Sequence, residues 1–157
     1  MRNKNSKGFG VAEIVVAVAV ISLSIFGLLS VANISLKTLR GNTNSIQAAF
    51  LLEEGVEAVK ILRDSGWNEN IVSLSAGTDY YLSFNGTTWK ATTTNAFIDN
   101  IYERKFAVNN VNRDGNDDIT ASGAFDPNTK KITVSVSWLS STGTTTKSIS
   151  TYITKLF

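Results

Sequence analysis

The hydrophobic pattern changes twice along the chain. Residues 14–32 are uncharged and mostly apolar, long enough at about 1.5 Å per residue to nearly span a hydrocarbon core of about 30 Å. Residues 46–62 then place apolar side chains at spacings of three and four, as an amphipathic helix does. From Ile71 onward the period is two, which is typical of strands. The pattern predicts an α+β fold, with a long N-terminal helix (transmembrane half plus amphipathic half) packed on a C-terminal antiparallel β-sheet.

We expect one helix from about Gly10 to Asp64, with Gly66 as its C-cap. Residues 41–45 interrupt the pattern, so the alternative is a break after Arg40 and a second helix with Asn44 as its N-cap. A continuous, weakened helix is favoured because one glycine costs only about 1 kcal/mol. The core-facing stripe is predicted to comprise Ile46, Ala49, Leu52, Val56, Val59 and Leu62.

The strand region begins with a hairpin signal. Residues 80–84 and 87–92 flank Asn85-Gly86, which predicts a type I′ turn. A strand over residues 101–111 directs Tyr102, Phe106 and Val108 to the core, and residues 126–129 read as a type I turn. The clearest strand alternates at Ile132, Val134, Val136 and Trp138, followed by a turn at 141–143 and a last strand containing Ile149, Tyr152 and Ile153.

A single carboxylate, Glu13, stands at the start of the apolar run. Inserting a charged side chain into a bilayer costs about 2.5 to 3.5 kcal/mol, so Glu13 requires a partner. Arg2, Lys4 and Lys7 precede it without any acidic residue, which predicts a cytoplasmic N-terminus. The partner is therefore expected from this basic leader, from a newly made chain terminus or from another subunit.

This N-terminal arrangement resembles the type IV pilin and pseudopilin family, whose basic leader ends in a glycine and whose mature chain has glutamate as its fifth residue. The resemblance implies cleavage between Gly8 and Phe9 by a prepilin peptidase/methyltransferase, N-methylation of Phe9, and an assembly salt bridge from Glu13 to the new amine. The chain departs from the family in having Gly10-Val11-Ala12 where Thr-Leu-Ile is usual, and Ser30 in place of a common proline.

The resemblance further implies a structural subunit, a minor pilin of the V type or an I-type pseudopilin, in a type IV pilus or a type II secretion-like filament. Its partners would be other pilin subunits, the lipid bilayer and an inner-membrane assembly platform. It would be a single-pass cytoplasmic membrane protein before joining an extracellular filament. The expected segments are the leader (1–8), the transmembrane/assembly helix (9–35), the amphipathic half (36–66) and the sheet domain (67–157).

Two other interpretations of the N-terminus remain open. An uncleaved signal anchor explains the length of the apolar run, and a secretory signal peptide could end at Ser30-Val31-Ala32. Neither gives Glu13 a role. Either would make the chain a signal-anchored or secreted β-rich binding domain that does not polymerise.

The amino-acid composition limits the reactions and ligands that can be expected of the chain. The chain has no Cys and no His, which excludes disulfide bonds and thiolate or imidazole catalysis. Its net charge of +2 comes from the leader, because residues 9–157 hold 12 basic and 13 acidic side chains. Residues 9–157 therefore lack the excess of basic side chains that direct nucleic-acid binding requires. The adjacent acids Glu53 and Glu54 read as solvated surface, and we expect neither enzymatic activity nor a cofactor.

One loop has the spacing of a cation site. Oxygen-bearing side chains alternate at Asn110, Asn112, Asp114, Asn116 and Asp118, as in the first half of a calcium loop. The twelfth position, where a bidentate glutamate belongs, is Ala121. The alternative is a polar connector between strands, so no metal is assigned.

Overall fold

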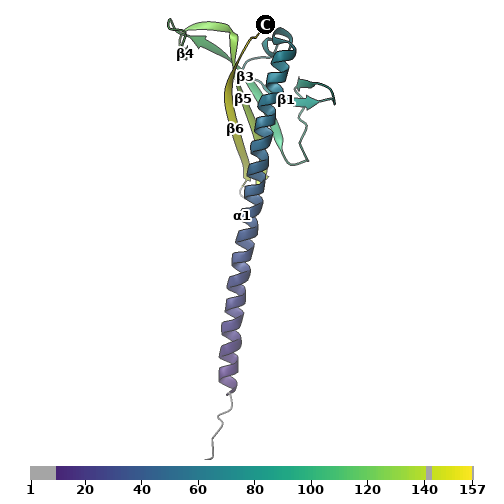
Figure 1. The fold of residues 1–157 in the computed structure, drawn as a ribbon. Coiled ribbons are helices and arrows are strands. Elements are labelled where there is room, and N and C mark those ends of the chain that lie inside the picture. The colour runs from purple at the N-terminus through teal and green to yellow at the C-terminus, as the bar shows by residue number, and fades with distance from the viewer. Residues whose placement is uncertain (1–9, 141–142, 157) are drawn as a thin grey trace, which may run out of the picture. The chain divides into compact units, whose positions relative to one another are not determined.

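The computed structural model describes residues 10–140 and 143–156 (Figure 1). Helix α1 (Val11–Ser65) is followed by a π-helical turn, η1 (Asn68–Val72). Six strands follow: β1 (Asp79–Phe84), β2 (Trp89–Thr92), β3 (Glu103–Arg113), β4 (Ile119–Thr120), β5 (Ala124–Ser140) and β6 (Gly143–Thr154). The predicted α+β arrangement, a long helix packed on an antiparallel sheet, is confirmed.

The chain divides into two compact units, one up to Thr43 and the other from Asn44 onward. Helix α1 contributes to both. It is continuous through residues 41–45, as favoured from the sequence, and the boundary between the units falls inside that stretch. The helix ends at Ser65, directly before the predicted cap Gly66.

The second unit is one antiparallel sheet covered on one face by α1. The strand order is β2-β1-β3-β5-β6, with β4 paired to the end of β3. The long pairings β3–β5 and β5–β6 form the centre of the sheet, so β2 and β6 are its edges. The turn predicted at 141–143 includes Ser141 and Thr142, which lie outside the described residues.

The core lies between residues 48–62 of α1 and the central strands. As predicted, β3 and β5 alternate, and Tyr102, Phe106 and Val108 are buried together with Ile132, Val134, Val136 and Trp138. The predicted helical stripe was wrong in its first half, because Ile46 and Ala49 are exposed. The residues of α1 that face the sheet are Ala48, Leu51, Leu52, Gly55, Ala58, Val59 and Leu62.

Small side chains explain the rotated stripe. A Cβ at position 55 would lie 2.7 Å from Val134 Cγ1 and 3.2 Å from Arg104 Cδ, so the sheet touches the backbone of α1 at Gly55. Ala48 and Ala58 border the same contact and are fully buried. A search for large apolar residues at helical spacing passes over such positions, because alanine and glycine give little hydrophobic signal.

Two predicted turns differ from the observed ones. Phe84 pairs with Trp89, so the β1–β2 loop spans residues 85–88 and is not a two-residue type I′ turn. The Asn85 side-chain oxygen accepts bonds from the amides of Thr87 (3.0 Å) and Thr88 (2.8 Å), which stabilises the longer loop.

Residues 126–129 lie within β5, where the pairing with β3 shifts between Asn110 and Val111. The Asx-type bond from the Asn128 amide to Asp126 Oδ1 (2.8 Å) explains why that segment resembles a turn in sequence.

Replacing Gly55 by alanine is expected to destabilise the second unit by about 1 to 3 kcal/mol, because the new methyl group overlaps Val134. Denaturant unfolding of the full chain in detergent micelles, followed by tryptophan fluorescence, measures the change. The matched control is Gly41→Ala, where a Cβ meets nothing within 4 Å and removal of a helical glycine stabilises by up to about 1 kcal/mol. Equal stability of both variants would contradict close packing at Gly55.

Candidate functional site

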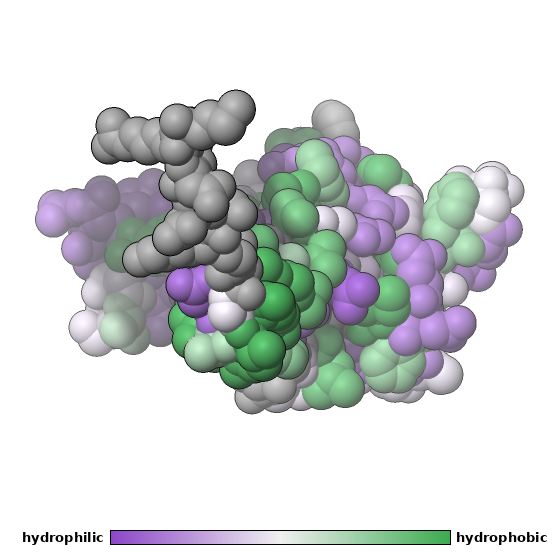
Figure 2. All heavy atoms as spheres, turned by 90° about the horizontal axis from the view of Figure 1, so that it is seen from below, coloured by the Kyte–Doolittle hydropathy of each residue, from purple (hydrophilic) through white to green (hydrophobic). Residues whose placement is uncertain are grey.

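The first unit presents an apolar helical surface that is exposed among the residues that the structure describes. Every large hydrophobic side chain from Val11 to Leu39 is more than half exposed. In Figure 2, green side chains dominate the described part of the helix nearest the viewer. By length and composition, α1 contains a segment able to cross a membrane.

Several hydroxyl side chains of this helical segment bond to its own backbone. The Ser22 hydroxyl donates to the carbonyl of Val18, and the Ser24 hydroxyl to that of Val20, each at 2.8 Å. Ser35 and Thr38 repeat the bond to the carbonyl four residues earlier, at 2.9 and 3.0 Å. Such bonds pair the hydroxyl donors of these four residues, which makes them compatible with a lipid environment.

Glu13 closes the first turn of α1. Its Oε2 accepts a hydrogen bond from the Gly10 amide at 3.1 Å, while the Gly10 carbonyl accepts from the amides of Glu13 and Ile14. Gly10 is thus the N-cap and Glu13 the third helical residue, the position from which a glutamate caps the preceding amide. The negative charge also lies at the positive end of the helix dipole.

The surface around Glu13 suits a neighbouring helix. A shallow hollow on this face is lined by Ala12, Glu13, Val16 and Ala17. Small residues beside a polar one are typical of positions where two helices approach closely within a membrane. Gly8 and Phe9, the predicted cleavage and methylation residues, and the basic leader lie outside the described residues.

In the second unit, Arg104 joins the sheet to the helix. Its Nη1 lies 2.8 Å from Glu54 Oε2 and 3.4 Å from the carbonyl oxygen of Leu51, and its guanidinium stands 5.3 Å from the Trp89 ring centroid. The Arg104 side chain is buried, whereas Glu54 is exposed, as expected from the sequence, and in addition pairs with this guanidinium. Sequence reasoning missed Arg104, although its place between Tyr102 and Phe106 in the alternation puts it on the inward face.

The residues of the candidate calcium loop are not brought together as a ligand set. Asn110 and Asn112 belong to β3, and the Asn110 side-chain oxygen already accepts a bond from Lys130 Nζ at 2.7 Å. Asp114 Oδ1 accepts the amides of Asn116 (2.8 Å) and Asp118 (3.0 Å), which closes the β3–β4 turn. Within residues 10–140 and 143–156, no group of three or more acidic side chains is arranged to hold a metal. The geometry therefore favours the polar connector.

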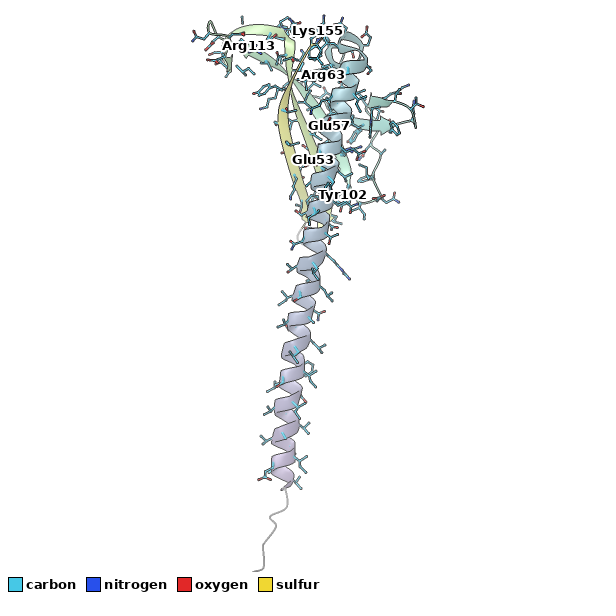
Figure 3. All side chains as sticks on the ribbon, in the orientation of Figure 1. Glu53, Glu57, Arg63, Tyr102, Arg113 and Lys155 are labelled. Carbon is cyan, nitrogen blue, oxygen red and sulfur yellow. The ribbon has the colours of Figure 1, made fainter. Side chains whose placement is uncertain are left out.

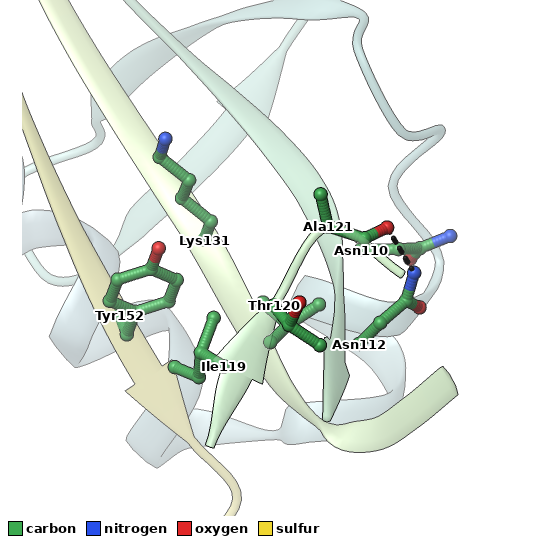
Figure 4. A pocket seen from close by; sticks show the side chains of 8 residues that line it. Asn110, Asn112, Ile119, Thr120, Ala121, Lys131 and Tyr152 are labelled. Carbon is green, nitrogen blue, oxygen red and sulfur yellow. Dashed lines mark hydrogen bonds between the residues drawn. The ribbon is translucent and has the colours of Figure 1, made fainter. Parts of the chain in front are cut away.

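A groove of about 360 Å³ adjoins this turn on the outer face of the sheet (Figure 4). Asn110 and Asn112 line it with Lys131, Tyr152 and β4, whereas Asp114, Asn116 and Asp118 do not. The candidate ligands are thus split between a groove and a turn. Lys131 and Tyr152 are direct cross-strand partners on β5 and β6.

Arg113 fixes the turn to β5. Its Nε lies 2.7 Å from Asp126 Oδ2, and its Nη1 donates to the Asp117 carbonyl at 2.7 Å. Figure 3 shows Arg113 near β4, at the opposite end of the sheet from Tyr102. The guanidinium, aided by the Thr129 hydroxyl and the Asn128 amide, lowers the pKa of Asp126 from 3.8 to about 2.

The comparisons with protein-family models, curated proteins and solved structures returned no match. The long apolar N-terminal helix followed by an antiparallel sheet fits a pilin-like layout.

Because the pKa of Asp126 is lower in the folded state, its stabilising effect is present above about pH 4 and is lost as the pH falls toward 2. We expect Asp126→Asn to be less stable than the parent chain at pH 7 and the two to converge near pH 2. Chemical denaturation at a series of pH values measures this difference. Glu53→Gln, a change at an exposed helical carboxylate, is the control; a constant gap between Asp126→Asn and the parent at every pH would contradict the assignment.

Proposed function

We propose that this chain is a type IV pilin-like structural subunit, a minor pilin or pseudopilin, that polymerises through its apolar helix. The observation that supports this most is a lone carboxylate, Glu13, opening a fully exposed apolar helix that continues into a sheet-covering segment. A membrane anchor alone requires the apolar residues and not the charge. A helix that polymerises requires both the apolar residues and the charge, because pairing of the charge determines which part of a neighbouring helix it contacts.

The proposed assembly contact follows from the position of Glu13. Cleavage after Gly8 creates an α-amine on Phe9, one residue before the Gly10 amide that Glu13 already binds at 3.1 Å. In an apolar environment the carboxylate and a free amine, of the same chain or of a staggered neighbour, neutralise one another. A head-to-tail contact of this kind is heterologous and does not close, so it generates a filament.

The remaining assignments belong to the same proposal. The precursor crosses the cytoplasmic membrane once with its N-terminus inside, and the peptidase/methyltransferase, the assembly platform and other subunits are its partners. In the filament the apolar helices pack in the interior and the sheet units form the exterior. The role is mechanical, and no reaction is assigned to the chain. The competing function is a membrane-anchored or secreted β-rich domain that never polymerises.

Mass spectrometry of the N-terminal peptide from protein purified from membranes of a host with a prepilin-processing system tests the maturation step. We expect a chain that begins at Phe9 and carries one added methyl group. A chain that begins at Met1 would indicate an uncleaved anchor, and one that begins at Asn33 would indicate ordinary secretion. Either result would overturn the filament proposal.

Glu13→Ala is expected to reduce incorporation into filaments at least tenfold while leaving the amount of protein in the membrane unchanged, because subunit docking uses the carboxylate whereas membrane insertion depends on the apolar residues. Immunoblots of sheared filaments and of membranes measure the two pools. Glu53→Ala, which removes an exposed carboxylate from the amphipathic half of the helix, is the matched control. Normal incorporation of Glu13→Ala would show that the carboxylate has no role in assembly.

A further inference from the structure

Three large apolar side chains are exposed together at one end of the second unit. Phe97 is 58% exposed, Ile101 49% and Leu139 77%. All three line one hollow of about 330 Å³, together with Asn100, Glu103, Ser137, Trp138 and Thr144. Apolar side chains gathered around a hollow mark an interaction surface more often than single exposed ones do. We call Phe97, Ile101 and Leu139 the apolar rim.

A tight turn lies between two residues of the rim. Asp99 and Asn100 are consecutive left-handed residues, with φ of 52° and 55°, a conformation that Asp and Asn tolerate better than other residues with a Cβ. The Ile101 amide donates to the Ile98 carbonyl at 3.0 Å, and a bond from the Ile98 amide to the Tyr102 carbonyl (2.8 Å) closes the loop. Phe97 and Ile101 therefore stand on either side of the turn.

The loop is anchored to the first turn of α1 within the same unit. The Tyr102 hydroxyl lies 3.3 Å from Asn44 Oδ1 and 3.2 Å from Gln47 Oε1, and Gln47 Nε2 donates to Asp99 Oδ2 at 3.4 Å. Figure 3 shows Tyr102 beside the lower part of the helix in this unit. The apolar rim therefore lies at the end of the unit from which the chain leads to the membrane-compatible segment.

The chain length limits how far this end can be from a bilayer. Only residues 33–43 separate the apolar run from Asn44. They belong to the continuous helix α1, so at about 1.5 Å per residue they span about 17 Å. The charges at the rim are mixed, with Asp99 and Glu103 acidic and Lys147, which donates to the Ser45 carbonyl at 3.5 Å, basic. This composition suits the apolar–polar boundary of a lipid layer and gives no preference for anionic headgroups.

We infer that the apolar rim is a second membrane contact, which inserts Phe97, Ile101 and Leu139 into the lipid interface while the chain is anchored as a single subunit. The inference rests on the membrane insertion of residues 14–32 within the proposed function and is independent of filament assembly. The rim residues are buried in lipid before assembly and leave it when the subunit is extracted.

The absence of native cysteine allows a direct test. Single variants Phe97→Cys, Ile101→Cys and Leu139→Cys of the full chain are labelled with a nitroxide and reconstituted at one copy per phosphatidylcholine nanodisc. Electron paramagnetic resonance then compares collision with oxygen, which partitions into lipid, and with a water-soluble nickel chelate. We expect at least a threefold higher oxygen-to-nickel ratio at the rim than at Leu156→Cys, a similarly exposed leucine beyond the far end of β6. The ratio is expected to be the same at 50 mM and 500 mM salt, since no charge drives the contact.

A label at Phe26→Cys, inside the apolar run, separates this inference from the function on which it rests. A lipid-exposed label at position 26 together with water-exposed labels at all three rim positions would overturn the rim contact alone. A water-exposed label at position 26 would overturn the membrane insertion of the helix, and the rim contact with it. If the rim labels became protected only when several copies shared one disc, the surface would be a subunit contact and the lipid inference would be wrong.

Discussion

The second unit depends on how closely α1 can approach the sheet. At Gly55 the helix backbone touches Val134 with no side chain between them. That proximity lets Arg104 reach Glu54 and the Leu51 carbonyl from the start of β3. Its Nε has no hydrogen-bond partner among the described residues, so the two contacts of Nη1 with α1 are what pairs this buried cation. A glycine and an arginine therefore fix the register between the two layers.

The same helix meets two different requirements along its length. In its apolar run the side chains are exposed, and the hydroxyls of Ser22 and Ser24 bond to carbonyls of the same helix, which suits a lipid environment. From Ala48 onward one face is buried against the sheet and the remaining faces hold charges such as Glu57 and Lys60. The change falls near residues 41–45, which interrupt the hydrophobic pattern and belong neither to the apolar run nor to the amphipathic stripe.

The sequence predicted the features that depend on strong periodicity. The alternation in β3 and β5 identified the buried apolar residues Phe106, Val108, Ile132, Val134, Val136 and Trp138, because large apolar side chains recur there at every second position. The helical stripe was displaced because Ala48, Gly55 and Ala58 contribute to packing through small size, which hydrophobic spacing does not register.

The β1–β2 loop was mispredicted because the Asn85 side chain bonds two following amides, an interaction that competes with the expected turn. Arg104 was missed because its partners lie on α1, about fifty residues earlier in the chain. The spacing of the 110–118 loop does not show that Asn110 Oδ1 accepts a bond from Lys130, which only the fold brings close. The role of Glu13 stays a prediction from the sequence, where a charge at the start of an apolar run is evident without a fold.

The outer face of β5 and β6 has a consequence for how the protein meets its surroundings. Facing hydroxyls on the two strands bond to each other across the sheet, Thr133 to Ser150 and Ser137 to Thr146, each at 2.9 Å. Hydroxyl groups do not titrate in the biological pH range and are not screened by salt. These hydroxyl pairs therefore stay uncharged in fresh water, brine or mild acid, so this part of the surface holds its hydration in each of them without charge repulsion.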